Sequence, residues 1–152
     1  MEPSIFEDVA DVLRGTVPRG LGELHCQPRR WGLKAWFDSV EPPREHYEAQ
    51  VIGARYCPAA TTLALEIGFH AEHKEAAANQ AVLDRLLDRQ AKWRKALGPE
   101  AEAGAFLGRA ERWRRVSETW PDPDLRGTDM VIEIAVRLAD YITALEPFRP
   151  LR

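Results

Sequence analysis

The feature that most constrains the fold of this chain is the alternation of side chains over residues 61–70. Every second position carries a large apolar residue, in the order Leu63, Leu65, Ile67 and Phe69. Neighbouring side chains of a β-strand project from opposite faces of a sheet, so the segment predicts a strand with one apolar face. The other face carries Glu66 and His70. A strand buried on one side only is typical of an antiparallel sheet.

Two earlier segments alternate in the same way and predict two more strands. In residues 31–38 the apolar set is Trp31, Leu33, Ala35 and Phe37, and the opposite set includes Lys34 and Trp36. In residues 46–56 one face carries Tyr47, Ala49, Val51 and Gly53, and the other includes Glu48 and Gln50. Pro42 and Pro43 separate the two segments, because proline does not continue a strand.

Apolar residues recur at helical spacing in three other segments. Residues 4–14 predict a first helix, residues 76–97 one long helix without glycine or proline, and residues 129–146 a last helix. Residues 16–28 contain many glycines and prolines and predict no long element. Residues 99–110 are expected to form a short helix or turn, and residues 111–119 a fourth strand.

These elements follow one another as α-β-β-β-α-β-α and predict an α+β domain. We expect an antiparallel sheet of about four strands with helices packed on one face. A length of 152 residues fits a single domain over 1–152, and no repeat or linker divides it. The order of elements is similar in topology to that of small secretion-chaperone domains, and no motif accompanies the similarity.

Charge and composition limit the classes of partner and the cellular compartment that we expect for this chain. A net charge of -3 gives no general attraction to nucleic acids or anionic lipids, so neither is an expected partner. The first residues differ from a signal peptide, and no apolar run is long enough for a membrane span. Cys26 and Cys57 are therefore expected to be reduced thiols in a cytoplasmic protein.

The strands at 46–56 and 61–70 are expected to form a hairpin. Its register follows from placing both apolar sets on one face. This register consists of the pairs Val51 with Ile67, Ala49 with Phe69, Gln50 with Gly68, and Glu48 with His70. The hairpin therefore has one apolar face and one polar face.

The polar face of the sheet is the expected ligand site. Its candidate residues are Trp36, Glu48, Gln50, Glu66 and His70. A shallow floor with polar groups at both ends suits a small molecule or a peptide. Glu66 and His70 are four residues apart on one strand, so their Cα atoms are about 13 Å apart, and we do not expect a direct acid–base pair.

The sequence His70-Ala71-Glu72-His73 contains ligand types that suit zinc. If His70 ends a strand and His73 begins a turn, however, the two imidazoles need not converge. The sequence identifies no further ligand, so we assign no metal ligand and expect no cofactor. The favoured interpretation is a polar turn, in which Glu72 and Glu75 lie near the positive end of the following helix.

A basic and aromatic cluster offers a hypothesis of polyanion binding. Its candidate residues are Arg94, Arg112 and Arg114, which accompany Trp93 and Trp113. Arginine neutralises phosphates, and tryptophan stacks on nucleic-acid bases. A solvated surface explains the same residues, because cations stabilise the C-terminus of a helix. We favour that second interpretation.

The function expected from the sequence is protein binding. The chain has no nucleophile motif and no phosphate-binding loop, so we assign no catalytic residue. Among its five tryptophans, Trp31, Trp36 and Trp120 lie in or beside segments that suit a protein interface. We expect a non-enzymatic interaction module, chaperone-like or regulatory, with homodimer formation as one mode of binding. The alternative is a small-ligand-binding domain or small enzyme that uses the polar face.

Overall fold

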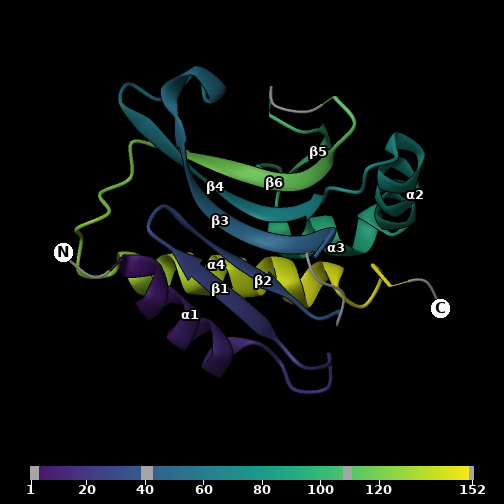
Figure 1. Ribbon diagram of the computed structural model, residues 1–152, viewed down its shortest axis with the longest axis horizontal. Coiled ribbons are helices and arrows are strands. Elements are labelled where there is room, and N and C mark those ends of the chain that lie inside the picture. The colour runs from purple at the N-terminus through teal and green to yellow at the C-terminus, as the bar shows by residue number, and fades with distance from the viewer. Residues whose placement is uncertain (1–3, 39–42, 108–110, 151–152) are drawn as a thin grey trace.

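The computed structural model describes residues 4–38, 43–107 and 111–150, and these form an α+β fold with one antiparallel sheet (Figure 1). The six strands are β1 (His25–Arg29), β2 (Gly32–Trp36), β3 (Glu45–Gly53), β4 (Leu63–Ala71), β5 (Glu102–Ala105) and β6 (Arg114–Pro121). Their order across the sheet is β1-β2-β3-β4-β6-β5. The helices are α1 (Ile5–Thr16), α2 (Ala76–Leu87), α3 (Gln90–Leu97) and α4 (Met130–Leu145), with a short 3-10 helix at Ala54–Tyr56.

The predicted class is confirmed, whereas the number of strands and the order of elements differ from the prediction. Two short edge strands were missed. β1 contains Pro28, which ordinarily argues against a strand but is tolerated at a sheet edge. β5 lies where a short helix or turn was expected, and its Glu-Ala-Gly-Ala sequence has little strand propensity. The β1 edge pairs with β2, which has the same length, and the β5 edge pairs with the longer β6. Pro42 lies outside the described residues.

The single long helix expected over residues 76–97 is divided into α2 and α3. The division falls at Asp88 and Arg89. Trp93 then lies on α3 so that its indole Nε1 donates a 2.6 Å hydrogen bond to the carbonyl of Leu86. The apolar spacing did not reveal this break, because both helices keep their apolar side chains on the buried side.

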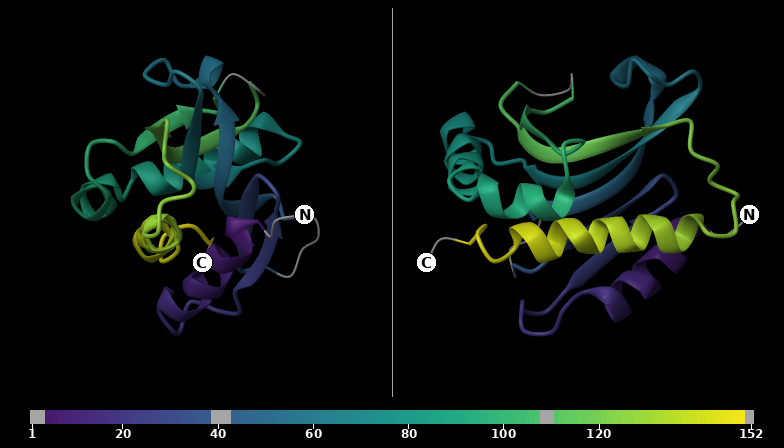
Figure 2. Two further views of the ribbon diagram at one scale, coloured as in Figure 1. Left: turned by 90° about the vertical axis from the view of Figure 1, so that its left-hand side faces the viewer. Right: turned by 180° about the vertical axis from the view of Figure 1, so that it is seen from behind.

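The helices cover one face of the sheet, as the view from behind in Figure 2 shows for α4 and α1. The strands direct apolar side chains toward these helices, including Leu33, Tyr47, Leu65, Ile67 and Phe69. Residues of α1 and α4, including Phe6, Leu13, Ile134 and Leu138, complete this core. No helix in the described part of the chain is long and apolar enough to cross a membrane.

The register between β3 and β4 differs from the predicted register by two residues. The observed pairs are Val51 with Leu65, Ala49 with Ile67, Gln50 with Glu66, Glu48 with Gly68, and His46 with His70. A shift of two residues keeps every side chain on its expected face, because the side-chain period of a strand is two. It does change the cross-strand partners on the polar face.

Candidate metal centre

The polar face of the sheet carries two His-x-Glu pairs on neighbouring strands. His46 and Glu48 lie on β3, His70 lies on β4, and Glu72 follows that strand directly. Residues two apart in a strand share a face. The amide of Glu72 donates a 2.7 Å hydrogen bond to the carbonyl of Arg44, so the pairing continues past the end of β4. All four side chains therefore project from the same face.

The observed register brings the two pairs into a single cluster. His46 lies opposite His70, so each glutamate lies diagonally across from the histidine of the other strand. His46 Nε2 is 2.9 Å from Glu48 Oε1 and 3.4 Å from Glu72 Oε2. His70 Nδ1 is 3.3 Å from Glu48 Oε1 and 3.2 Å from Glu72 Oε2. Imidazole nitrogens and carboxylate oxygens thus alternate around a closed ring.

The size of this ring matches the coordination shell of a transition metal. One ligand atom from each side chain lies within 4.8 Å of the other three. Zinc bonds of about 2.0–2.1 Å to nitrogen and oxygen place tetrahedral ligand atoms about 3.3 Å apart. The four nitrogen–oxygen distances, from 2.9 to 3.4 Å, lie close to that value, and the nitrogen–nitrogen and oxygen–oxygen separations extend to at most 4.8 Å, so binding of an ion would draw these atoms together.

Glu66 orients the His70 ring from the side remote from the cluster. His70 Nε2 lies 2.6 Å from Glu66 Oε2, and Gln50 donates a 2.9 Å hydrogen bond to the other oxygen of that carboxylate. Both His70 and Glu66 are fully buried. With the Nε2 proton donated to Glu66, loss of the second ring proton leaves the Nδ1 lone pair directed toward Glu48 and Glu72. Metal-bound histidines are commonly held by a carboxylate in this way.

The contact between Glu66 and His70 corrects the sequence-based expectation that these residues do not pair. Gly68 lies between them and contributes no side chain, so the longer neighbours lean toward each other across it. Gly68 has a φ of 154°, and a Cβ there would lie 2.3 Å from the carbonyl oxygen of Val116. The close approach of β6 therefore requires glycine at the position that lets the two side chains meet.

Electrostatics favours a positive charge among the four side chains. Burial raises the pKa of Glu48, but its close contacts with the His46 and His70 rings outweigh this effect and hold the pKa well below the ordinary carboxyl value. The same balance lowers the pKa of Glu72 to about 2. For His70, burial lowers the pKa, and the charge of Glu66 together with the nearby carboxylates of Glu48 and Glu72 raises it well above the ordinary value.

Two ring nitrogens in the cluster lack a hydrogen-bond partner. Both His46 Nδ1 and His70 Nδ1 are buried with no hydrogen-bond partner among the residues that the structure describes. His70 Nδ1 is the atom that faces Glu48 and Glu72, at 3.3 and 3.2 Å. Buried polar atoms are almost always satisfied, so an exception at the centre of a ligand cluster calls for an explanation. Coordination of a cation by this nitrogen supplies one.

A cavity of about 380 Å³ lies against the cluster. It is lined by Arg29, Lys34, Glu48, Gln50, Glu72, Phe106 and Trp113. The Phe106 ring packs edge-on against His70, with ring centroids 4.7 Å apart, and Trp113 packs edge-on against Phe106. The two glutamates are thus accessible from the cavity, whereas both histidines are shielded from solvent.

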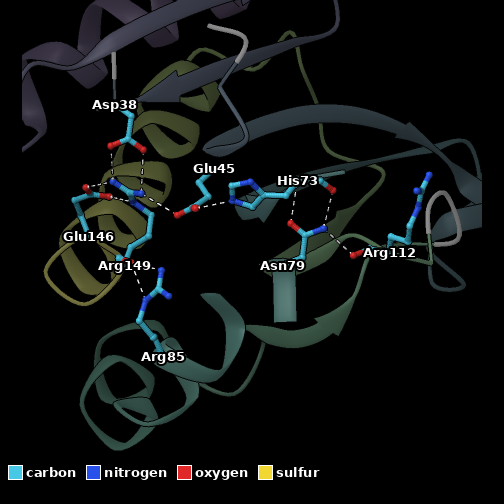
Figure 3. Close-up of polar contacts among 8 residues, drawn as sticks. All are labelled: Asp38, Glu45, His73, Asn79, Arg85, Arg112, Glu146 and Arg149. Atoms are coloured by element: carbon cyan, nitrogen blue, oxygen red, sulfur yellow. Dashed lines mark hydrogen bonds and ion pairs between the residues drawn. The ribbon is translucent and has the colours of Figure 1, made fainter. Parts of the chain in front are cut away.

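His73, the other histidine of the predicted turn, belongs to a second network, drawn in Figure 3. Its Nε2 lies 2.7 Å from Glu45, and its backbone amide donates to the side chain of Asn79 near the start of α2. Arg149 bridges Glu45, Glu146 and Asp38 in the same network, at 2.9, 2.7 and 3.1 Å. This network fixes the ends of β3 and β4 from the helical side.

The remaining sequence candidates occupy separate places. Trp36 is buried and stacks on His25, with ring centroids 5.6 Å apart, and it is not among the described residues that line the cavity. Arg94 donates to Gln90 and to the carbonyls at the end of α3. Arg112 donates to the carbonyl of Lys74, and Arg114 to Gln80 and the carbonyl of Glu111. Polyanion binding by these arginines stays a prediction.

Sequence reasoning identified Glu48, Glu66 and His70 but missed His46. The available signal was the repeated spacing His46-x-Glu48 and His70-x-Glu72 in two strands expected to pair. With a register two residues away from the true one, His46 had no partner opposite it. Glu72 was assigned instead to the turn that precedes a helix.

The comparisons with known proteins identify no relative. No family model matches the chain, and no curated protein or solved structure is significantly similar to it. The function is therefore inferred from the geometry of the chain itself.

Proposed function

We propose that this protein is a metal-binding domain that holds one divalent transition-metal ion on the polar face of its sheet. The ligands are His46 Nε2, His70 Nδ1 and one oxygen each from Glu48 and Glu72. The observation that carries this proposal is the convergence of these four atoms within 4.8 Å. The carboxylate of Glu66 behind His70 supports it independently, as does the Nδ1 of that ring, which has no hydrogen-bond partner within residues 4–38, 43–107 and 111–150.

The donor set favours zinc or a neighbouring first-row metal over calcium or magnesium. Two imidazoles and two carboxylates suit zinc, iron, nickel and manganese, whereas calcium and magnesium prefer oxygen ligands alone. The two carboxylates also neutralise the charge of a divalent ion. Since Glu48 and Glu72 line the cavity, an ion held by them is within reach of a small molecule there.

The direct test compares His46→Ala with His73→Ala. Cobalt(II) serves as a spectroscopic substitute for zinc, and zinc affinity is measured by competition with a chelator. We expect His46→Ala to weaken zinc binding roughly a hundredfold or more, because it removes a ligand. His73→Ala removes a nearby imidazole that faces Glu45 and should leave the affinity within about twofold.

Two results would contradict the metal centre. One is a wild-type protein whose cobalt spectrum matches that of the free aqueous ion. The other is equal weakening by both substitutions, because the cluster and the second network would then be indistinguishable. Thermal unfolding of both metal-free variants checks that each protein is folded.

Self-association is a second candidate function, and a groove beside α4 favours it. The groove is lined by Trp120, Pro121, Ile132, Glu133, Val136, Arg137 and Asp140. Ile132 and Val136 are 55% and 42% exposed, so two large apolar side chains of α4 lie side by side at the surface of this groove. Acidic and basic residues border the groove, so a second copy of the chain could pair with it about a twofold axis.

Light scattering tests self-association. The wild-type protein should have the mass of a dimer, and Ile132→Asp should shift it to the mass of a monomer, because the charge cannot be buried between two copies. Exposed Trp31, at the other edge of the sheet, provides the matched control Trp31→Asp. A monomeric wild-type protein at high concentration would rule this function out.

A further inference from the structure

The cavity beside the metal centre has two basic residues at its border. Lys34 is the cross-strand partner of Glu48, one strand away from the metal ligands. Arg29 lies on β1 and lines the same cavity. Neither side chain forms an ion pair within the part of the chain that the structure describes. Arg29 donates a 3.0 Å hydrogen bond to Gln27, which is neutral, so the positive charges of Arg29 and Lys34 both remain for an anion in the cavity.

We propose that the cavity binds a small organic carboxylate, with its carboxylate group on the metal and against Lys34. This inference rests on the proposed metal centre and names the class of ligand that the centre takes. The carboxylate adds to the four protein ligands from the side that Glu48 and Glu72 leave accessible.

The charges around the cavity favour an anion once the metal is bound. Glu48 and Glu72 together balance a divalent ion. Lys34 and Arg29 carry two positive charges, and the buried Glu66 compensates for one of them. A cavity with surplus positive charge attracts an anion and holds it by charge-assisted hydrogen bonds.

The aromatic wall favours an organic anion over an inorganic one. Phe106 is almost fully buried, and Trp113 packs edge-on against it at 5.6 Å. The Phe106 amide donates a 3.1 Å hydrogen bond to the carbonyl of Trp113, which holds the two rings together. A volume of about 380 Å³ lies within the range that holds small molecules. An apolar body fits against these rings while its carboxylate reaches the metal.

Three probes separate the parts of this ligand. Benzoate carries a carboxylate and an aromatic body, acetate carries the carboxylate alone, and benzamide carries a similar body without charge. Each is titrated into the cobalt-loaded protein and followed by the visible cobalt spectrum and by calorimetry. We expect benzoate to change the spectrum, acetate to do so at higher concentration, and benzamide to leave it unchanged.

The variant Lys34→Met tests the role assigned to the cation. It should weaken benzoate binding about tenfold, because one charge-assisted hydrogen bond is lost, while cobalt affinity changes by less than about twofold. The matched control is Lys92→Met, on the exposed side of α3, which should change neither affinity. Equal benzoate affinity in wild type and Lys34→Met would overturn the assignment.

The same titration separates failure of this inference from failure of the metal centre. If cobalt does not bind, the proposed function fails and this inference fails with it. If cobalt binds and benzoate leaves its spectrum unchanged, only the carboxylate site is overturned. Benzoate that binds equally well without metal would also overturn it, because the anion would then not be a metal ligand.

Discussion

Two polar clusters lie on opposite faces of the sheet at β3 and β4, and they differ in the positive charge that compensates their carboxylates. On the helical side, the guanidinium of Arg149 contacts the carboxylates of Glu146, Glu45 and Asp38. Glu146 also accepts a 2.9 Å hydrogen bond from the Tyr47 hydroxyl. Glu45 and Tyr47 immediately precede His46 and Glu48 in the sequence, so adjacent residues serve separate clusters.

The difference between the clusters is whether the protein supplies its own cation. The Arg149 cluster contains a permanent positive charge with a donor directed at each carboxylate, as expected of a structural cross-link. In the cluster of His46, Glu48, His70 and Glu72, the only groups that can carry a positive charge are the two imidazoles. No arginine or lysine of the described residues forms an ion pair with its glutamates. A self-sufficient cluster stabilises the fold, whereas one that lacks a permanent cation is suited to bind one.

The largest effect expected from this comparison is on stability. Arg149→Met leaves the buried carboxylate of Glu146 and the partly buried carboxylate of Glu45 without the guanidinium, which should lower the free energy of unfolding by about 3–5 kcal/mol. Zinc affinity, measured below the unfolding temperature, should stay unchanged. Urea unfolding with and without zinc measures both quantities on one protein.

A double variant controls for the loss of packing around Arg149. Glu146→Gln combined with Arg149→Met removes a carboxylate together with its cation, so it should be less destabilised than Arg149→Met alone. A stable Arg149→Met protein that has lost zinc binding would remove the distinction between the two clusters.

The sequence predicted the faces of the sheet but not the alignment of its strands. Alternation in residues 61–70 assigned Glu66 and His70 to the polar face, and that assignment is independent of register. The cross-strand partners depend on how far one strand is shifted along the other. Alternation does not determine this shift, because a shift of two residues keeps every side chain on the same face. This freedom explains why Glu48 was paired with His70 and why His46 was overlooked.

Other parts of the candidate site depend on contacts that no local pattern encodes. The contact between Glu66 and His70 requires a glycine between them and the close approach of β6, a strand about fifty residues later in the chain. The aromatic wall likewise comes from Phe106 and Trp113, which flank a segment after β5. β5 itself was expected to be helix or turn, so this wall could not be placed beside the polar face.

A smaller effect is expected from Glu66→Gln, which changes the support of a metal ligand without removing the ligand. Glu66 fixes His70 through its Nε2 proton, and loss of such a carboxylate typically weakens metal binding about 10–100-fold. Nitrogen chemical shifts of the His70 ring should show that Nε2 loses its strong acceptor.

The matched control for Glu66→Gln is Glu102→Gln. Glu102 pairs with Arg115 on the neighbouring strand and does not contact the cluster. Zinc affinity should therefore stay at the wild-type value in Glu102→Gln. If both substitutions weaken zinc equally, the effect comes from overall charge and not from the orientation of His70.

The smallest expected effect is a pH dependence that has opposite signs in the metal-free and metal-bound protein. The raised pKa of His70 stabilises the metal-free protein below the ordinary value of 6.5, and this contribution is lost as the pH rises through the folded value. The lowered pKa values of Glu48 and Glu72 add stability above the ordinary value of 4.5, which is lost as the pH falls. The cluster therefore stabilises the metal-free protein most between these two ordinary values.

Zinc competes with the proton on His70 Nδ1, so the stabilisation of the protein by zinc increases as the pH rises. Coordination needs a deprotonated Nδ1, and the affinity should rise with pH by up to about tenfold per unit until the folded pKa is passed. The increase in unfolding temperature caused by saturating zinc should then be larger at pH 8 than at pH 6. In the Arg149→Met protein the same increase should persist, because the cation of the other cluster takes no part in it. An increase in unfolding temperature that is the same at pH 6 and pH 8 would show that zinc displaces no proton from His70. His70 would then not be a metal ligand, and the proposed difference between the two clusters would be wrong.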